Sequence, residues 1–393
     1  MSKKIITFGK LFAIIAVVVA AIIINGSISV HADNGETVRV STAKELKAAI
    51  KNADVGTIIF RTKAYINVTI KADTAAKGKS LIIDAPNASI TNKAVFANIN
   101  ILNADFYTEN VSGNIISLSD CYMSRGFTVA KKKKVKSLTV YDSSGSFFNF
   151  YTLRKGAKIN ELELVYSGDM YPAKSSYNKS KRLLTISCTN DECERSYKIK
   201  LDKSGRMVSI DCDSNWSEAD YEETFKYDSN GNIIQNNGRE NMSGNYTMEK
   251  TYSGNLVQKS VYKDEYSSGV YTYTYDKDGK LVHFEYKGES TMDGDTSQME
   301  NTYDFEYDKK GREIYERWED TIIDTFREEY YTFNSKGFLT EVLINTAGAE
   351  AVYKYKYNKA GDLIQETYIS EGYTTTTTYE YDELGYLIGR QDS

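Results

Sequence analysis

The chain has 393 residues, with 49 lysines and arginines against 54 aspartates and glutamates and a formal net charge of −5. Residues 33–170 hold 19 basic and 13 acidic residues, whereas residues 171–393 hold 27 and 41. Tyrosine is divided in the same way, with 26 of 32 copies after residue 170. An acidic, tyrosine-rich second half argues against nucleic acid as a partner, because phosphates require a basic surface. We therefore predict two domains with a boundary near residue 170.

Residues 1–32 have the pattern of a secretory signal peptide. Three early lysines precede an apolar run from Leu11 to Ile24, and Val30-His31-Ala32 offers a cleavage site between small residues. The alternative is a retained membrane anchor, but crossing the hydrocarbon core takes about 20 apolar residues, and this run is shorter. We expect an exported protein whose signal peptide is removed.

The first domain is predicted to begin with a short strand and one amphipathic helix. Thr42 and Glu45 form a capping-box pattern, in which the hydroxyl and the carboxylate satisfy free amides at the start of a helix. Leu46, Ala49 and Ile50 then fall on one helical face. This face is available to cover an apolar core.

Short β-branched runs follow the helix at near-constant spacing, which fits strands stacked rung upon rung. Each rung would bury alternate side chains in a shared interior, and the helix would cover the open end and its strand edge. The last two runs match in phase, so that Val135 corresponds to Ile159 and Leu138 to Leu162. The runs lie at residues 57–60, 66–70, 81–84, 97–101, 135–140 and 159–164.

The stretch Val40-Ser41-Thr42-Ala43-Lys44-Glu45-Leu46-Lys47-Ala48-Ala49-Ile50, followed by Asp54-Val55-Gly56-Thr57-Ile58-Ile59-Phe60, resembles the parallel β-helix of the pectate-lyase type. Lyases of that type hold calcium with clustered aspartates and take a proton with a cationic side chain. Here the aspartates are scattered singly, and Arg125 has no acidic partner at fixed spacing. These departures from the family pattern favour a non-catalytic scaffold, and the alternative is the calcium-assisted lyase that the resemblance implies. The aspartates are Asp54, Asp73, Asp84, Asp105, Asp120 and Asp142.

Four consecutive lysines stand out in the basic first domain. Lys131, Lys132, Lys133 and Lys134 could hold a teichoic acid, an anionic polysaccharide or a membrane surface. The alternative is a solvated loop between two rungs. We include the four lysines among the candidate binding residues.

A motif of tyrosine, aspartate or asparagine, two variable residues and glycine recurs through the second domain. Its glycines fall at positions 205, 231, 254, 279, 311, 337, 361 and 385, so the successive steps are 26, 23, 25, 32, 26, 24 and 24. Such self-similarity predicts a repeat architecture. Complete copies begin at Tyr227, Tyr275, Tyr307, Tyr357 and Tyr381, and weaker copies lie at residues 201–205, 252–254 and 333–337.

Each copy of the motif predicts a turn between two strands. The tyrosine closes an alternating strand, as at residues 271–275, and the aspartate or asparagine bonds back to the backbone. The glycine then takes the left-handed conformation that other residues resist. A second strand follows, as at residues 280–286, so each repeat is predicted to be one hairpin with a return turn beside its neighbours.

With a degenerate first copy at residues 177–181, these repeats resemble the YD-repeat (Rhs-repeat) family of secreted bacterial proteins. In large members of the family, long arrays form a closed shell around a toxic cargo. Here the array is short and no Asp-Pro-x-Gly self-cleavage motif follows the last copy, so we expect an open array and no toxin. The resemblance implies binding of carbohydrate or a cell surface through aromatic rings.

The regular spacing of the motif tyrosines favours cross-strand packing for them. Trp216, Trp318, Tyr330 and Tyr331 lie outside the fixed positions of the motif and are the better candidates for exposed contacts. Their alternative is a place in the core.

The four cysteines are Cys121, Cys188, Cys193 and Cys212. Cys188 and Cys193 flank a good hairpin turn and are the candidate disulfide. Cys188 and Cys212 are one repeat apart, which is one strand spacing in a solenoid but two in a meander, and two exceeds disulfide reach. No CxxC motif is present, and the sequence predicts no metal site.

Nucleophilic catalysis finds no support, because His283 is the one histidine after the signal peptide and no GxSxG motif accompanies it. The carboxylate pairs Glu222-Glu223 and Glu328-Glu329 are adjacent on strands, so their side chains point to opposite faces. A glycosidase pair built from distant residues is not recognisable in the sequence.

These observations predict an all-β protein in which a helix-capped parallel β-helix over residues 36–170 precedes an open array of YD-repeat β-hairpins over residues 171–393. We expect a secreted or loosely surface-associated protein that binds a polysaccharide or cell-wall polymer without catalysis. No cofactor, nucleic acid or stable membrane span is predicted. The alternatives are a polysaccharide lyase or hydrolase on the β-helix and an exported module that binds another protein through a sheet edge.

Overall fold

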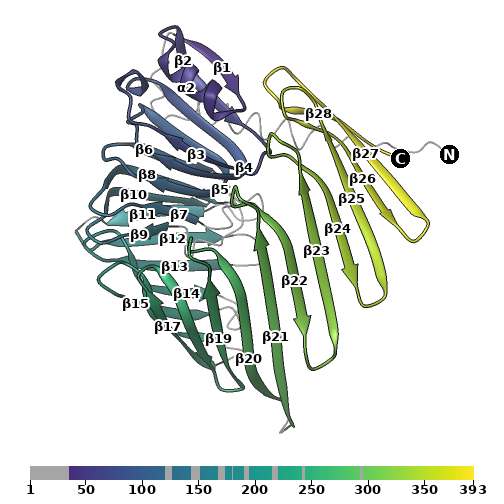
Figure 1. Ribbon diagram of the computed structural model, residues 1–393. Helices are drawn as coiled ribbons and strands as arrows, with labels where there is room; N and C mark the ends of the chain where they lie inside the picture. The colour runs from purple at the N-terminus through teal and green to yellow at the C-terminus, as the bar shows by residue number, and fades with distance from the viewer. Residues whose placement is uncertain are drawn as a thin grey trace, which may run out of the picture.

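The structure is a computed structural model that describes residues 35–119, 126–142, 151–166, 173–178, 180–189, 194–214, 220–240, 244–292 and 295–393. Its strands form a 10-stranded sheet with parallel pairing and an 18-stranded antiparallel sheet (Figure 1). The change from parallel to antiparallel pairing falls between Tyr166 and Ala173. The predicted all-β class, a parallel solenoid followed by an open antiparallel array, is confirmed.

The parallel strands form a solenoid with two walls. One wall has the order β1-β2-β4-β5-β6-β8-β10, and the other contains β3, β7 and β9 with the second halves of β4 and β5. The predicted match between the last two runs is the register of β8 and β10, where Val135 is the partner of Ile159 and Leu138 of Leu162. The strands are β1 (Glu36–Val40), β2 (Val55–Arg61), β3 (Ile66–Ile70), β4 (Ser80–Asn92), β5 (Asn98–Glu109), β6 (Ile115–Ser119), β7 (Gly126–Val129), β8 (Lys134–Asp142), β9 (Tyr151–Leu153) and β10 (Lys158–Tyr166).

Helix α2 (Ala43–Lys51) covers the first rung of the solenoid, as predicted. The Thr42 hydroxyl accepts from the Glu45 amide at 3.2 Å, and the Glu45 carboxylate accepts from the Thr42 amide at 3.1 Å, so the capping box is complete. The buried side chains of the helix are Leu46, Ala49 and Ile50. A single-turn helix, η1 (Thr74–Ala76), follows β3.

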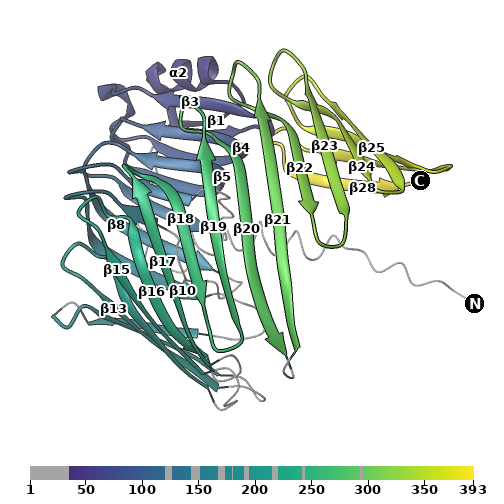
Figure 2. The ribbon, with the colours of Figure 1, turned by 60° about the horizontal axis from the view of Figure 1, so that its bottom comes forward.

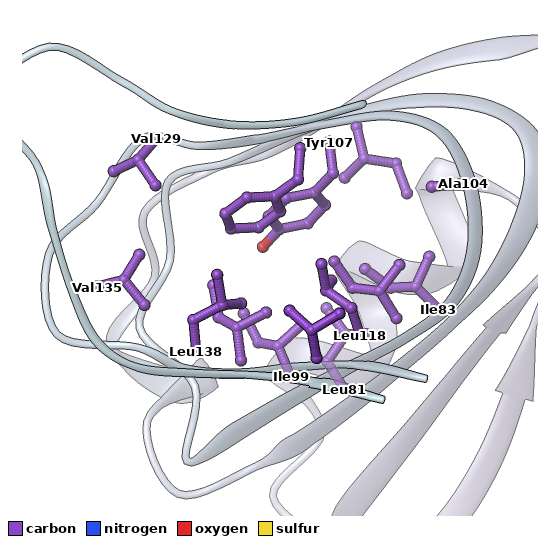
Figure 3. Packing of buried hydrophobic residues seen from close by; sticks show 14 of the residues in the cluster. Leu81, Ile83, Ile99, Ala104, Tyr107, Leu118, Val129, Val135 and Leu138 are labelled. Atoms are coloured by element: carbon purple, nitrogen blue, oxygen red, sulfur yellow. The ribbon is translucent and has the colours of Figure 1, made fainter. Parts of the chain in front are cut away.

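The solenoid interior is lined mainly by aliphatic side chains and contains one stacked aromatic pair. Figure 3 shows the ring of Tyr107 facing the aliphatic side chains of the opposite wall, among them Leu118 and Leu138. The ring of Phe127 stacks on that of Tyr107. The ring centroids are 5.5 Å apart with 3° between the planes. Each such fully buried side chain contributes roughly 1.5–3 kcal/mol to folding, so the stacked rungs form the main core of the molecule.

The antiparallel sheet is a meander in which each strand pairs with the next one in the sequence, as the repeat pattern predicts. Its strands are β11 (Ala173–Asn178), β12 (Leu183–Thr189), β13 (Glu194–Leu201), β14 (Met207–Ser214), β15 (Tyr221–Tyr227), β16 (Ile233–Glu240), β17 (Gly244–Ser253), β18 (Leu256–Lys263), β19 (Ser267–Tyr275), β20 (Leu281–Met292), β21 (Asp295–Tyr307), β22 (Glu313–Asp320), β23 (Thr325–Phe333), β24 (Leu339–Thr346), β25 (Ala349–Tyr357), β26 (Leu363–Ser370), β27 (Tyr373–Tyr381) and β28 (Leu387–Asp392).

The turns of the motif have the predicted geometry. The Asp228 carboxylate accepts from the Asn230 amide at 2.7 Å and from the Asn232 amide at 2.9 Å, while Gly231 has a φ of +89°. The same turn begins at Asp202, Asp276, Asp308, Asn334, Asn358 and Asp382. One feature was not predicted: the pairing shifts register directly before the motif aromatic, as between Lys226 and Tyr227. This bulge recurs in each full repeat, where the strand after the turn has one extra residue opposite the motif tyrosine, such as Ile234.

The meander is attached to the solenoid at both of its ends. Its first turns lie on the last rungs, where the Ile159 amide donates to the Ser204 carbonyl at 3.1 Å and the Tyr151 hydroxyl donates to the Gly205 carbonyl at 2.6 Å. In Figures 1 and 2 the sheet then extends away from β10 and comes back beside β1 and β4.

The returning turns contact the first rungs through a set of residues that we call the clasp. Arg39 and Asp362 form an ion pair whose side chains are only 10% and 6% exposed. The Arg61 guanidinium donates to the Leu384 carbonyl at 2.8 Å and stacks on the Tyr386 ring. Tyr65 donates its amide to the Gly337 carbonyl at 2.8 Å and packs edge-on against Phe333. The clasp therefore joins residues more than 250 positions apart in the sequence.

Candidate functional site

The motif tyrosines bind successive repeats to one another. The Tyr227 hydroxyl donates to the Met207 carbonyl at 2.7 Å, and the Tyr252 hydroxyl donates to the Ile233 carbonyl at 2.9 Å. The Arg206 guanidinium lies 4.6 Å from the centre of the Tyr227 ring. These contacts agree with the interpretation of the motif tyrosines as packing residues, so the candidate site lies elsewhere on the sheet.

The strands in the middle of the meander carry aromatic side chains on one face, which we call the aromatic face. Successive ring centroids along it are close, at 4.6 Å for Tyr271 and Tyr286, 5.1 Å for Tyr273 and Phe284, and 5.4 Å for Phe284 and Tyr303. Side chains of directly paired residues share a face, and Trp318 is the partner of Tyr303. The face is defined by Tyr271, Tyr273, Phe284, Tyr286, Tyr303, Phe305 and Trp318, all of them half-buried.

The opposite face of the same strands is a network of charges. His283 Nδ1 lies 2.7 Å from an Asp304 carboxylate oxygen, and Lys287 forms ion pairs with Glu285 and Glu300 at 2.9 and 3.1 Å. The lone histidine therefore has a structural partner on a polar surface. The two faces of these strands thus differ in chemistry, and we take the aromatic face as the candidate binding surface.

A polar group lies beside Trp318 on the aromatic face. Arg327 is the cross-strand partner of Trp318, and its guanidinium pairs with the Glu329 carboxylate at 2.6 Å. The Tyr331 hydroxyl donates to Glu329 at 2.8 Å and contacts Glu316 at 3.4 Å. Glu316 and Glu329 are direct cross-strand partners, so two carboxylates share one phenol.

The electrostatics of this group follow from partial burial. Burial, with a smaller contribution from the Glu329 charge, raises the pKa of Glu316 above its ordinary value. Burial and the hydrogen bond to Glu329 likewise raise the pKa of Tyr331 far above the usual range, so its phenol stays protonated as a donor. The surface thus offers flat rings, a fixed cation, carboxylate acceptors and a phenol within one hairpin.

The structure brings two of the predicted contact residues together and separates a third. Trp318 and Tyr331 both lie on the aromatic face. Tyr330 lies on the opposite face, 39% exposed, with its ring 5.0 Å from Tyr315. Trp216 lies outside the described residues. The candidate site is therefore built around Trp318, without Tyr330.

The predicted lysine run lies on the solenoid, in the turn after β7 and at the first residue of β8, and shares no residue with the aromatic face. Lys131, Lys132 and Lys134 are exposed and Lys133 is half-buried. The run is thus a second, separate candidate surface.

The structure describes the backbone of two of the four cysteines, Cys188 and Cys212. Cys188 is on β12, whose antiparallel neighbour is β13, while Cys193 and Cys121 lie outside the described residues. Cys212 is a buried free cysteine on β14, two strands away from β12. The strands that carry Cys188 and Cys212 are thus two strand spacings apart, which is the meander arrangement considered in the sequence analysis.

The aspartates of the solenoid are separate from one another. Asp84 pairs with Arg61 at 2.9 Å and accepts from Asn103 at 3.1 Å, and Asp105 accepts from Ser89 at 3.2 Å. Among the described residues, no group of three or more histidine, cysteine, aspartate or glutamate side chains could hold a metal ion. Asp120 and Arg125 lie outside those residues.

Sequence reasoning missed Glu316, Arg327, Glu329 and Tyr303 as members of the site. Each is one of many charged or aromatic residues in the second domain, and none belongs to the motif. The usable signal was the hairpin register: counting outward from the turn at residues 321–324 pairs Trp318 with Arg327 and places their neighbours on the same face.

The fold and the site define a β-repeat protein in which a parallel solenoid precedes an antiparallel meander with one aromatic face. No protein-family model matches the chain, and no curated protein matches it. Among solved structures it is similar to TcdB2-TccC3-TEV, at 13% identity and a TM-score of 0.26, over 56% of this chain and 14% of that chain.

Two further likenesses are of the same strength. TcdB2-TccC3 without its hypervariable C-terminal region has 12% identity and a TM-score of 0.27, over 58% of this chain and 15% of that chain. A porin-like protein from Bacteroides uniformis has 11% identity and a TM-score of 0.24, over 54% of this chain and 91% of that chain. The chain thus spans about a seventh of the length of the two TcdB2-TccC3 chains. Likenesses this weak carry no argument about activity.

In the described part of the chain, no helix is both long and apolar enough to cross a membrane.

Proposed function

We propose that this chain is an exported, non-catalytic binding protein that recognises a polysaccharide through the aromatic face of its meander. The observation that carries the proposal is the surroundings of Trp318. An aromatic ring stacks on the apolar face of a sugar, and the neighbouring cation, carboxylates and phenol suit its hydroxyl groups. Export is supported by the N-terminal sequence pattern.

The extent of the aromatic face favours an extended ligand over a small molecule. Aromatic pairs follow one another across β19, β20, β21 and β22, and adjacent strands lie about 4.8 Å apart. A ligand that crosses these strands meets a new ring at each step. Pocket-bound small molecules instead need an enclosed cavity.

A binding assay with matched variants tests the proposal. Purified protein is titrated with a panel of neutral plant and bacterial polysaccharides, and released reducing ends and unsaturated uronides are followed in the same samples. Trp318→Ala is expected to weaken binding about tenfold, the equivalent of about 1.4 kcal/mol, which is within the range of one aromatic stacking contact. Tyr330→Ala, on the opposite face, is the control and should bind as the unaltered protein does.

Two results would contradict the proposal. Product formation would replace a binding protein with an enzyme, and equal binding by both variants would place the ligand away from the aromatic face.

A further inference from the structure

Two consecutive turns of the solenoid place lysines directly on top of each other. The Lys132 amide donates to the Lys155 carbonyl at 3.1 Å, and the Lys158 amide donates to the Lys133 carbonyl at 3.0 Å. Lys134 and Lys158 are direct partners in the pairing of β8 with β10. The turn at residues 154–158 thus extends the lysine run onto the next rung.

We call this surface the lysine corner and define it by Lys131, Lys132, Lys133, Lys134, Lys155 and Lys158. Successive rungs of a parallel sheet lie about 4.8 Å apart, so six like charges occupy a small area. No ion pair joins any of them to a carboxylate within the described residues. Like charges at this spacing repel one another, and a bound polyanion would relieve the repulsion.

The backbone of the lysine corner is strained at one lysine. Lys132 has a φ of +62°, a left-handed conformation that costs a non-glycine residue free energy. One rung later the same position holds Gly156, with a φ of +70°. The chain thus has a lysine where the neighbouring turn shows that glycine fits. Strain of this kind is concentrated at functional positions.

We propose that the lysine corner binds a linear polymer with an anionic group on each unit. Ammonium groups on flexible stems act as point charges for phosphate or carboxylate. A thin chain can lie along the two rungs beside the turn of the meander, whose Asn230 carbonyl accepts from the Lys155 amide at 3.0 Å. An anionic membrane would approach the acidic second domain as well. That domain has 41 acidic and 27 basic residues, so it would repel the membrane.

The borders of the lysine corner limit its width. On one side Arg154 donates to Asn232 at 2.6 Å and to Asn255 at 3.2 Å, and the nearby Asp228 carboxylate is bonded within its own turn. Further along β10, Glu161 lies against Ser137, away from the turn. These neighbours leave a narrow basic ridge, which suits a chain-like ligand.

The proposal is independent of the aromatic face, and matched variants test it. The corner variant carries Lys131→Gln, Lys133→Gln, Lys155→Gln and Lys158→Gln. The control replaces the three exposed lysines of α2 in the same way: Lys44→Gln, Lys47→Gln and Lys51→Gln.

The probes are poly(glycerol phosphate), polygalacturonate, a neutral polysaccharide and vesicles with anionic lipid. The corner variant is expected to bind at least one polyanion at least tenfold more weakly than the unaltered protein, whereas the control binds it as before. Raising the salt concentration from 50 to 200 mM should weaken the binding of the unaltered protein. The first two probes distinguish a phosphate polymer from a carboxylate polymer. Neutral-polysaccharide binding should be the same in both variants, which separates this proposal from that for Trp318.

A single substitution separates charge from structure. Lys132→Gly removes the backbone strain of a lysine with a left-handed φ, so the unfolding midpoint should rise. It also removes one positive charge, so polyanion binding should weaken. A merely structural lysine would change stability and leave binding unaltered. The proposal is overturned if no polyanion binds, if the control loses as much affinity as the corner variant, or if anionic vesicles bind more tightly than both polymers.

Discussion

Glu109 is predicted to make the stability of the solenoid depend on pH. Its side chain is fully buried at the end of β5. The carboxylate accepts from Tyr107 at 3.0 Å, from the amide groups of Asn92 and Asn114 at 3.1 and 3.3 Å, and from the Val111 backbone at 3.1 Å. Burial raises the pKa of Glu109 from 4.5 to about 7, although these four donors act in the opposite direction.

The sign of the pH dependence follows from the direction of this shift. The folded chain holds the Glu109 proton more tightly than the unfolded chain, so the stabilisation is complete below pH 4.5. It is lost as the pH rises to about 7 and stays constant above that value. The rise from 4.5 to about 7 corresponds to about 3 kcal/mol at about 1.4 kcal/mol per pH unit.

Urea unfolding followed by circular dichroism between pH 4.5 and pH 8 measures this effect. Glu109→Gln cannot titrate, so its stability should decline less over that range than the stability of the unaltered chain. The glutamine amide places N–H donors next to the donors that surround Glu109, which lowers the free energy of unfolding by the same amount at every pH. The diagnostic quantity is therefore the slope of the unfolding free energy against pH. Glu163→Gln, on the exposed side of β10, is the control and should keep the original slope. Parallel curves for the unaltered chain and Glu109→Gln would refute the reasoning.

Two further predictions concern the attachments of the meander. Asp362→Ala leaves the guanidinium of Arg39 buried without its partner and should lower the free energy of unfolding by about 3–5 kcal/mol. Faster hydrogen exchange in β25–β28 but not in β12–β15 would locate the loss at the clasp. Unchanged exchange in β25–β28 would contradict that role. Gly231→Ala places a methyl group against the Leu153 carbonyl in a left-handed backbone, so it should cost more than the roughly 1–2 kcal/mol of the backbone effect alone. Gly254→Ala has the same backbone requirement in open space and is its control, so equal shifts in the urea midpoint would show that the contact with Leu153 is unimportant.

The local parts of the fold were predictable because their causes are local. The capping box of Thr42 and Glu45 lies within a single helical turn, and the turn from Asp228 to Gly231 is equally short. The match between β8 and β10 was also readable, because stacked rungs repeat the same apolar pattern. With that match, Lys155 and Lys158 could have been assigned to the surface of the lysine run.

The contacts between distant segments were not predictable from this one sequence. Nothing near Arg39 indicates Asp362, which lies 323 positions later. The bulge opposite each motif tyrosine was not recognised, because its extra residue on the strand after the turn is isoleucine or valine (Ile234, Val282 and Ile314), which is equally typical of a regularly paired strand. The surroundings of Trp318 depend on hairpin register and on which face is polar, and both are properties of the assembled sheet.

Attachment at two points connects the number of repeats to the length of the solenoid. The meander leaves the last rung and returns to the first, so its strands must cover the distance between the two attachments. One additional repeat adds two strands, about 10 Å of sheet. An array lengthened in this way either bends more strongly or loses the clasp, whereas an array shortened by one repeat falls short of Arg39. A change in repeat number in such a chain is therefore tolerated when the number of rungs changes with it.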